Sequence, residues 1–219
     1  MPLYKIKNKL ILFIHIPKTA GLSIHNFLAA KGALVTSYDR YIFDVPCSSQ
    51  HHHSDVLKQY LVPESIDYCF TIVRNPLDRL ISEFKYRHRA PIRSMRIPPK
   101  FIKRRLLHDM SDNHRNRYFA AWTNNCFKRY QKDPFHLFNH IRPQSQFTEF
   151  PNARIFKLED QLSELRESLG AILDLKIDAF PSDNVSESFN LQADLETRER
   201  IFDFYREDYA RLPYRLPQS

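Results

Sequence analysis

The sequence predicts an α/β fold in which helices flank a mostly parallel central sheet. Apolar runs of strand length alternate along the chain with amphipathic segments of helix length, which is the pattern of such folds. The apolar runs are continuous, as expected of strands covered on both faces. With 219 residues, of which 42% are hydrophobic, the chain is long enough to form one domain with its own core.

Two strand-and-helix units open the chain. Leu10–Ile14 is the first apolar run, and Ser23–Ala30 after it predicts a helix with one apolar face. The second run, Tyr68–Val73, is rich in aromatic and β-branched residues and predicts a strand. A helix from Pro76 to about His88 follows it, since proline suits a first helical turn.

The rest of the chain adds a third unit and a closing helix. Arg154–Leu158 predicts a strand, the leucines from Leu162 to Leu173 a helix, and Leu195–Ala210 a last amphipathic helix. Residues 89–116 are the least regular stretch, and we expect them to form a basic insertion within a single domain spanning residues 1–219. Because ligands of parallel sheets bind at the carboxyl ends of the strands, the loops after the first two strands are the candidate site.

Composition excludes several classes of protein. No apolar run approaches the roughly 18 residues of a membrane span, and the opening run has no small-residue cleavage site, so we expect a soluble, unexported chain. The three cysteines are widely spaced and form no CxxC pair, which argues against a disulfide framework or a structural zinc site. A reducing cytoplasm is therefore the expected compartment.

The positive charge is concentrated in one segment. The chain has a formal charge of +8, and residues 85–117 hold eleven basic residues against two acidic ones. Such a patch suits a polyanionic partner, which could be a nucleic acid, a sulfated or carboxylated glycan, an anionic membrane surface or a nucleotide. A solvated basic loop on the surface explains the same composition.

The loop after the first strand has the composition of an anion site. Lys18, Thr19, Gly21 and Ser23 stand between a strand and a helix, where backbone N–H groups, hydroxyls and an ammonium meet the positive end of the helix dipole. An ordinary turn with Ser23 as the N-cap would explain Gly21 and Ser23, but not Lys18 and Thr19 beside them. The Walker pattern is absent, because the lysine precedes the glycine.

The segment His15–Ser23 resembles the 5′-phosphosulfate loop of the carbohydrate sulfotransferases, which include the heparan sulfate 2-O- and 6-O- and the chondroitin and dermatan enzymes. Their pattern, H-[IV]-P-K-[TC]-[AG]-G-[TS]-[ST], is broken only at Leu22. The resemblance implies a P-loop-like fold and a loop that grips 3′-phosphoadenosine 5′-phosphosulfate (PAPS), with Lys18 stabilising the bridging oxygen as the sulfuryl group leaves. The nucleotide-binding residues that it implies here are Pro17, Lys18, Thr19, Ala20, Gly21, Leu22 and Ser23.

The loop after the second strand resembles the same family's 3′-phosphate motif, R-[ND]-P-x-x-R-x-x-S. In that motif the first arginine and the serine hold the 3′-phosphate, which here implies Arg74 and Ser82. Without the resemblance, the segment could be a helix start in which Asp78 pairs with Arg79 or Arg74. The two motifs lie about 50 residues apart and in the family's order, so together they specify the family more strongly than either alone.

Weaker similarity extends over most of the chain. His140–Gln146 resembles the H-x-x-P-Q element of bacterial and Golgi relatives, Phe156–Asp160 their next strand and acidic turn, and Phe202–Tyr209 their closing helix. The segment Asn184–Phe189 departs from the family, since it has Glu187 where relatives often carry basic residues in a loop that closes over the nucleotide.

Sulfuryl transfer to a hydroxyl needs a base, and histidine has a suitable ordinary pKa. Three consecutive histidines precede Arg74 by about 20 residues. His53 best matches the family's catalytic histidine in its H-A-D context, His52 is the alternative by spacing, and Glu83 is the next candidate. An exposed histidine loop or a fortuitous metal site would also explain the cluster, although three consecutive side chains cannot all reach one ion in regular structure.

The sequence therefore predicts a sulfotransferase that transfers the sulfuryl group from PAPS, without a metal, to a hydroxyl of a carbohydrate, expected to be anionic. A nucleotide-dependent phosphotransferase and a nucleic-acid-binding module are the alternatives. The sequence has no Walker loop and no identifiable Mg²⁺ carboxylate, which a phosphotransferase would need. It also has no known nucleic-acid-binding motif. Golgi relatives have an amino-terminal anchor, whereas the first strand begins near Met1. We therefore expect a bacterial cytoplasmic enzyme or a trimmed Golgi-type luminal domain.

Overall fold

The computed structural model describes residues 2–36, 41–88, 107, 110–181, 190–212 and 214. The chain divides into two compact units. The first comprises Met1–Asn75 and Asp133–Asp183, and the second Pro76–Lys132 and Asn184–Ser219. The single domain expected from the sequence stays a prediction. Most of the expected basic insertion, residues 89–106 with 108 and 109, lies outside the described residues.

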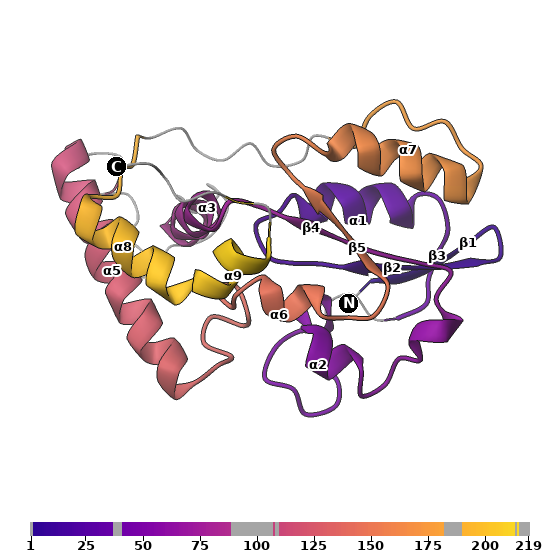
Figure 1. Ribbon diagram of the computed structural model, residues 1–219, viewed down its shortest axis with the longest axis horizontal. Helices are drawn as coiled ribbons and strands as arrows, with labels where there is room; N and C mark the ends of the chain where they lie inside the picture. Colours follow the sequence, from indigo (N-terminus) through magenta and orange to yellow (C-terminus); the bar gives the residue numbers. More distant parts are fainter. Residues whose placement is uncertain are drawn as a thin grey trace, which may run out of the picture. The chain divides into compact units, whose positions relative to one another are not determined.

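A five-stranded sheet in the order β3-β1-β2-β4-β5 forms the centre of the first unit (Figure 1). Strands β2, β4 and β5 pair in parallel, while β1 pairs antiparallel with both β2 and β3, so that β1 alone runs against the other strands of the sheet. The expected α/β class with a mostly parallel sheet is confirmed. The strand bounds are Leu3–Ile6 for β1, Lys9–Ile14 for β2, Ala33–Leu34 for β3, Tyr68–Val73 for β4 and Ala153–Lys157 for β5.

The two central strands are buried on both faces, as their continuous apolar runs predicted. The last four residues of β2 and all six of β4 are buried. Helices α1 (Gly21–Ala29) and α7 (Leu162–Leu173) cover one face, and α2 (Ser54–Leu57) and α6 (Ser145–Thr148) the other (Figure 1). The core against α1 and α7 contains Tyr4, Ile6, Ile11, Phe13, Ile24, Phe27, Leu28, Tyr68, Phe70, Ile72, Phe156, Leu165, Leu169 and Leu173.

The strands β1 and β3 were not predicted. The turn from β1 to β2 consists of Lys7 and Asn8, which have φ values of 46° and 61°. A two-residue turn with both φ values positive matches the twist of a β-hairpin, so it joins β1 to β2 directly. Short 3₁₀ turns at Ser49–His51 and Pro63–Ser65 complete this unit.

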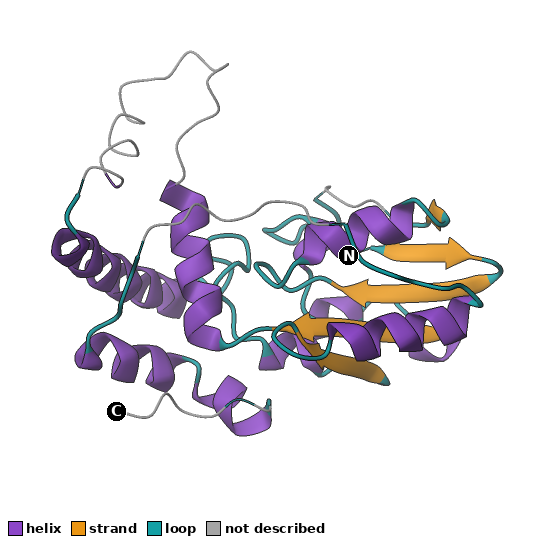
Figure 2. Ribbon diagram, turned by 90° about the horizontal axis from the view of Figure 1, so that it is seen from above, coloured by secondary structure: helices purple, strands orange, loops and turns teal. Residues whose placement is uncertain are grey.

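The second unit is helical in its described part (Figure 2). It contains α3 (Pro76–His88), α5 (Asp112–Lys132), α8 (Leu195–Phe204) and α9 (Arg206–Arg211). Aromatic rings join these helices: Phe127 of α5 stacks on Phe204 of α8 at 3.7 Å between centroids. The prediction of a single closing helix at 195–210 is wrong, because α8 and α9 are separate helices. The chain leaves the helical conformation at Tyr205, with φ −102° and ψ 24°, and its ring is buried in the unit.

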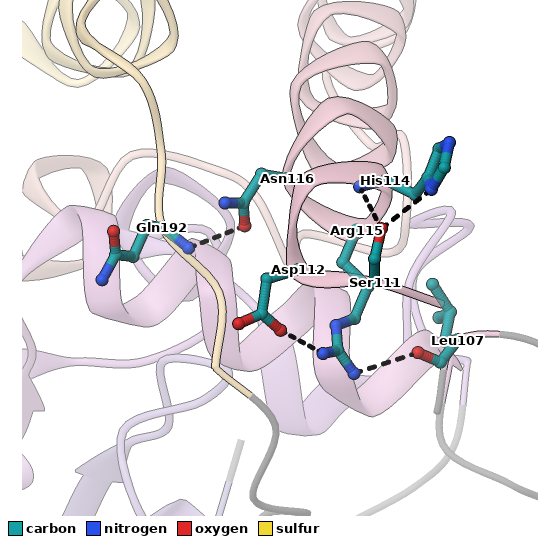
Figure 3. Close-up of polar contacts among 7 residues, drawn as sticks. All are labelled: Leu107, Ser111, Asp112, His114, Arg115, Asn116 and Gln192. Atoms are coloured by element: carbon teal, nitrogen blue, oxygen red, sulfur yellow. Dashed lines mark hydrogen bonds and ion pairs between the residues drawn. The ribbon is translucent and has the colours of Figure 1, made fainter. Parts of the chain in front are cut away.

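The start of α5 corrects one boundary of the expected insertion. Residues 112–116 form the first turns of this helix, so the irregular stretch ends before Asp112. Arg115 donates from Nη1 to the Leu107 carbonyl at 3.2 Å and forms an ion pair with Asp112 (Figure 3). The side-chain oxygen of Asn116, Oδ1, accepts a hydrogen bond from the Gln192 backbone N–H at 2.9 Å. These contacts join the start of α5 to Leu107, which precedes the helix in the sequence, and to Gln192, which follows it.

Among the described residues, every helix is too short or too polar to cross a membrane. The three cysteines are buried free thiols. Burial raises the pKa of Cys47 to about 11 and that of Cys69 and Cys126 to about 12. All three therefore remain protonated and unreactive near neutral pH.

Candidate active site

The loop between β2 and α1 has the backbone of an anion cradle. Lys18 and Ala20 have φ values of 70° and 63°, and Thr19 between them does not have a positive φ. This alternation turns successive backbone N–H groups toward one side and forms a concavity for an anion. The left-handed conformation costs a non-glycine residue about 1–2 kcal/mol, and such strain is typically retained at functional sites. Helix α1 begins at the next residue, so the positive end of its dipole adds to the cradle.

Position 21 must be glycine because the ring of His15 occupies the space that a side chain would need. A Cβ at this position would lie 1.8 Å from Nε2 of His15. The His15 ring is buried, is stacked on Phe13 at 5.5 Å and meets the edge of His51 at 4.9 Å. The Gly21 backbone therefore approaches the His15 ring so closely that no larger residue fits at this position. Sequence reasoning gave His15 no role, although it is the first residue of the loop pattern.

The other side chains of the loop divide into internal and accessible ones. The Thr19 hydroxyl is buried and donates to the Ile16 carbonyl at 2.8 Å, so it holds the loop together and leaves only the Thr19 backbone N–H for an anion. Ser23 is buried in the first turn of α1, and the N-cap position belongs to Ala20, so the interpretation of Ser23 as the cap is wrong. Pro17 is buried, Lys18 is half-buried and Leu22 is exposed.

Arg74 brings the second motif to the first loop. Its Nη1 donates to the Lys18 carbonyl at 3.4 Å. Its backbone is held by side chains from distant parts of the chain: Gln144 contacts both its N–H and its carbonyl, and Glu159 accepts from the next N–H, that of Asn75, at 2.7 Å. Gln144 belongs to the H-x-x-P-Q element, and that similarity was the only sequence signal for it.

Ser82, the other residue of the second motif, belongs to the second unit, where it is buried on α3. Its neighbour Glu83 is fully buried and pairs with Nε of Arg87 at 2.5 Å. Proton uptake would break this ion pair, so Glu83 is a poor candidate for the base. Arg79 is also buried, with its guanidinium 5.9 Å from the ring centre of Tyr205.

The three consecutive histidines are buried, which rules out the exposed-loop interpretation. His53 stands immediately before α2, with Nδ1 3.4 Å from Nδ2 of Asn139. His52 places Nδ1 2.8 Å from the Tyr60 hydroxyl, and its Nε2 is buried without a hydrogen-bond partner in the described part of the chain. His51 packs against the rings of His15 and His140. Within the described ranges, no group of three or more His, Cys, Asp or Glu side chains could hold a metal ion.

Burial sets the protonation state of this cluster. It lowers the pKa of His15 to about 3 and those of His52 and His53 to about 4, and the Arg142 charge contributes at His53. Burial also lowers the pKa of His51 well below its ordinary value. All four imidazoles are therefore neutral at pH 7, the state in which a histidine can accept a proton.

The same burial predicts acid sensitivity. In the unfolded chain His15 takes up a proton below its ordinary pKa of 6.5, whereas in the folded chain it stays neutral down to about pH 3. The contribution of neutral His15 to stability is therefore complete above pH 6.5 and falls as the pH drops below it. We expect the free energy of unfolding to fall by about 2 kcal/mol between pH 7 and pH 5 for His15 alone. Urea unfolding at both pH values measures this loss. An equal free energy of unfolding at pH 7 and pH 5 would contradict the prediction.

The site thus combines an anion cradle at a helix N-terminus, an arginine joined to that cradle, and neutral histidines in the same unit. Comparison with protein families agrees with this chemistry: the model of the sulfotransferase family matches residues 4–215. No curated protein and no solved structure matches the chain. The match covers nearly the whole sequence, including both motifs and the H-x-x-P-Q element. The chain belongs to the sulfotransferase family, with its P-loop-like α/β fold, and uses PAPS as the donor of the sulfuryl group.

Proposed function

We propose that this sulfotransferase transfers the sulfuryl group from PAPS to a hydroxyl of an anionic carbohydrate. The observation that carries the proposal is the charge of residues 85–117, which hold eleven basic residues and two acidic ones. The phosphates of the nucleotide are assigned to the two loops, so this excess charge needs another anionic partner. In the described part of the segment, Arg87 and Arg115 are already paired with carboxylates. The acceptor would therefore meet the remaining basic residues.

The transfer can be followed through this chain's own residues. The backbone N–H groups of the cradle and the N-terminus of α1 hold the 5′-phosphosulfate, and Arg74 holds the 3′-phosphate. A bond from the acceptor oxygen to sulfur forms as the bond from sulfur to the bridging oxygen breaks. Lys18 stabilises the negative charge that develops on that bridging oxygen, and His53 takes the proton of the acceptor hydroxyl.

This assignment predicts a selective loss in Arg74→Ala. The variant should bind adenosine 3′,5′-bisphosphate about 1.5–3 kcal/mol more weakly, the scale of a hydrogen bond to a charged group. Affinity for adenosine 5′-monophosphate, which lacks the 3′-phosphate, should barely change. Isothermal titration with both nucleotides measures the difference. Equal losses for the two would instead indicate a general structural role for Arg74.

The acceptor class is tested by a transfer screen with labelled PAPS over sulfated or carboxylated glycans, neutral glycans and simple alcohols. We expect anionic glycans to accept sulfate with the lowest KM, and that KM should rise with salt because screening weakens the attraction. Transfer only to neutral glycans would overturn the anionic acceptor. Transfer only to simple alcohols would overturn the proposal that the acceptor is a carbohydrate.

Membership of the sulfotransferase family decides against the two alternatives that the sequence left open, the phosphotransferase and the nucleic-acid-binding module. No observation on the described residues favours either one.

A further inference from the structure

Gln144 makes an unusual pair of contacts. Its side chain is fully buried. Its Oε1 accepts from the backbone N–H of Arg74 at 2.9 Å, and its Nε2 donates to the Arg74 carbonyl at 2.8 Å. A side-chain amide that bonds both backbone groups of one residue replaces a neighbouring strand, because a strand partner would offer the same donor and acceptor.

Arg74 needs such a partner because the sheet ends just before it. The β4–β5 pairing runs to Val73, whose carbonyl accepts from Leu158 N–H at 2.9 Å. Arg74 is the next residue, and helix α3 begins two residues later at Pro76, which has no N–H. The backbone groups of Arg74 therefore lie between the hydrogen bonds of the β4–β5 pair and those of helix α3. Gln144, 70 residues further along the chain, satisfies both of them.

The Arg74 side chain is held much less firmly than its backbone. The Arg74 Nη1 donates to the Lys18 carbonyl at 3.4 Å, a long and weak hydrogen bond. The direction of the guanidinium therefore depends on the backbone conformation of Arg74. Glu159 fixes the following N–H, that of Asn75, at 2.7 Å, so Gln144 and Glu159 together determine how the arginine leaves the strand.

We infer that Gln144 is a positioning residue: it holds the backbone of Arg74 so that the guanidinium stays beside the first loop, ready for the 3′-phosphate of PAPS. The inference rests on the role proposed above for Arg74. Gln144 itself is fully buried, its amide is bonded to the Arg74 backbone, and no nucleotide contact is assigned to it. Its effect should therefore appear as lost selectivity for the 3′-phosphate, transmitted through Arg74.

The direct test is Gln144→Met, which keeps the length of the side chain and removes both hydrogen bonds. We expect the affinity for adenosine 3′,5′-bisphosphate to fall about tenfold, the scale of one or two hydrogen bonds, with little change for adenosine 5′-monophosphate. Gln161→Met is the matched control. That glutamine accepts from the Lys157 N–H at 2.8 Å at the end of β5, so its loss removes a similar bond without touching Arg74.

A double-mutant cycle with Arg74→Ala separates positioning from simple destabilisation. When Arg74 is already alanine, Gln144→Met should cost no further affinity for adenosine 3′,5′-bisphosphate. An equal loss with and without Arg74, or equal losses for both nucleotides, would overturn the inference. If Gln144→Met does not fold, Gln144→Glu keeps the acceptor and places an oxygen against the Arg74 carbonyl in place of the donor. It should show the same selective loss, and normal selectivity in that variant would also overturn the inference.

The cycle distinguishes two kinds of failure. A selective loss in Arg74→Ala without one in Gln144→Met would remove the positioning role and leave the proposed nucleotide site intact. The absence of a selective loss in Arg74→Ala would overturn the assignment of Arg74 and, with it, the role of Gln144.

Discussion

Replacing His53 with alanine is expected to lower kcat by roughly 10²–10⁴-fold and to leave the affinity for adenosine 3′,5′-bisphosphate unchanged. The imidazole is neutral at pH 7 because burial lowers its pKa to about 4. It can therefore accept the proton of the acceptor hydroxyl, and no nucleotide contact is assigned to it. Single-turnover sulfate transfer and nucleotide titration on the same preparation separate the two effects.

The contact between His53 and Asn139 is weak. The Asn139 amide nitrogen donates to the His51 carbonyl at 2.8 Å and lies 3.4 Å from both Cys47 Sγ and His53 Nδ1. Its second hydrogen is therefore shared between two distant acceptors. A bond of this length is weak, so His53 can offer a free nitrogen to the substrate.

Two variants serve as controls for His53→Ala. His53→Asn keeps a polar group near the position of Nδ1, fills part of the space and cannot act as a base, so it should be as inactive as the alanine variant. His52→Ala should retain most of the activity, because both nitrogens of His52 are directed into the protein. An inactive His52→Ala beside an active His53→Ala would move the base by one residue. Normal turnover in every histidine variant would place the base elsewhere.

Lys18→Ala is expected to lower kcat by roughly 10²-fold with a modest change in nucleotide affinity. Its charge is most useful when negative charge develops on the bridging oxygen, so it stabilises the transition state more than the bound nucleotide. Alanine is as restricted as lysine in the left-handed conformation that residue 18 adopts. The substitution should therefore leave the backbone of the cradle unchanged. The measurements are kcat and the Kd for adenosine 3′,5′-bisphosphate.

Lys31→Ala is the matched control for this substitution. Lys31 lies in the same unit, near the opposite end of α1, and its ammonium lies 5.8 Å from the ring centre of Phe27. Loss of this charge should leave kcat near normal. Lys18→Arg, which keeps the positive charge, should recover part of the activity. A near-normal kcat in Lys18→Ala would remove the lysine from the mechanism.

Elements whose signal lies in consecutive residues were predictable. The continuous apolar run of β4 and the proline at the start of α3 gave the bounds Tyr68–Val73 and Pro76–His88, both confirmed. The loop of Lys18 and the motif of Arg74 are also contiguous patterns, and they identified the family that the comparison then confirmed. Other elements were missed. Strands β1 and β3 are short, and β3, with only two residues, exists because β1 offers it a partner. The 21-residue helix α5 was also missed, and its first residues fell within the expected irregular stretch.

Amino-acid order alone thus determined strands β2, β4 and β5, helices α1, α3 and α7, the two loops and the family, because side-chain periodicity and loop chemistry are local properties. Tertiary structure alone decided which distant groups complete those loops. It placed the His15 ring where a Cβ of Gly21 would stand, turned the Thr19 hydroxyl inward, and set Gln144 against the backbone of Arg74. These contacts follow from how the chain packs. A buried backbone group must find a partner, and only the folded chain determines which side chain is near enough to supply it.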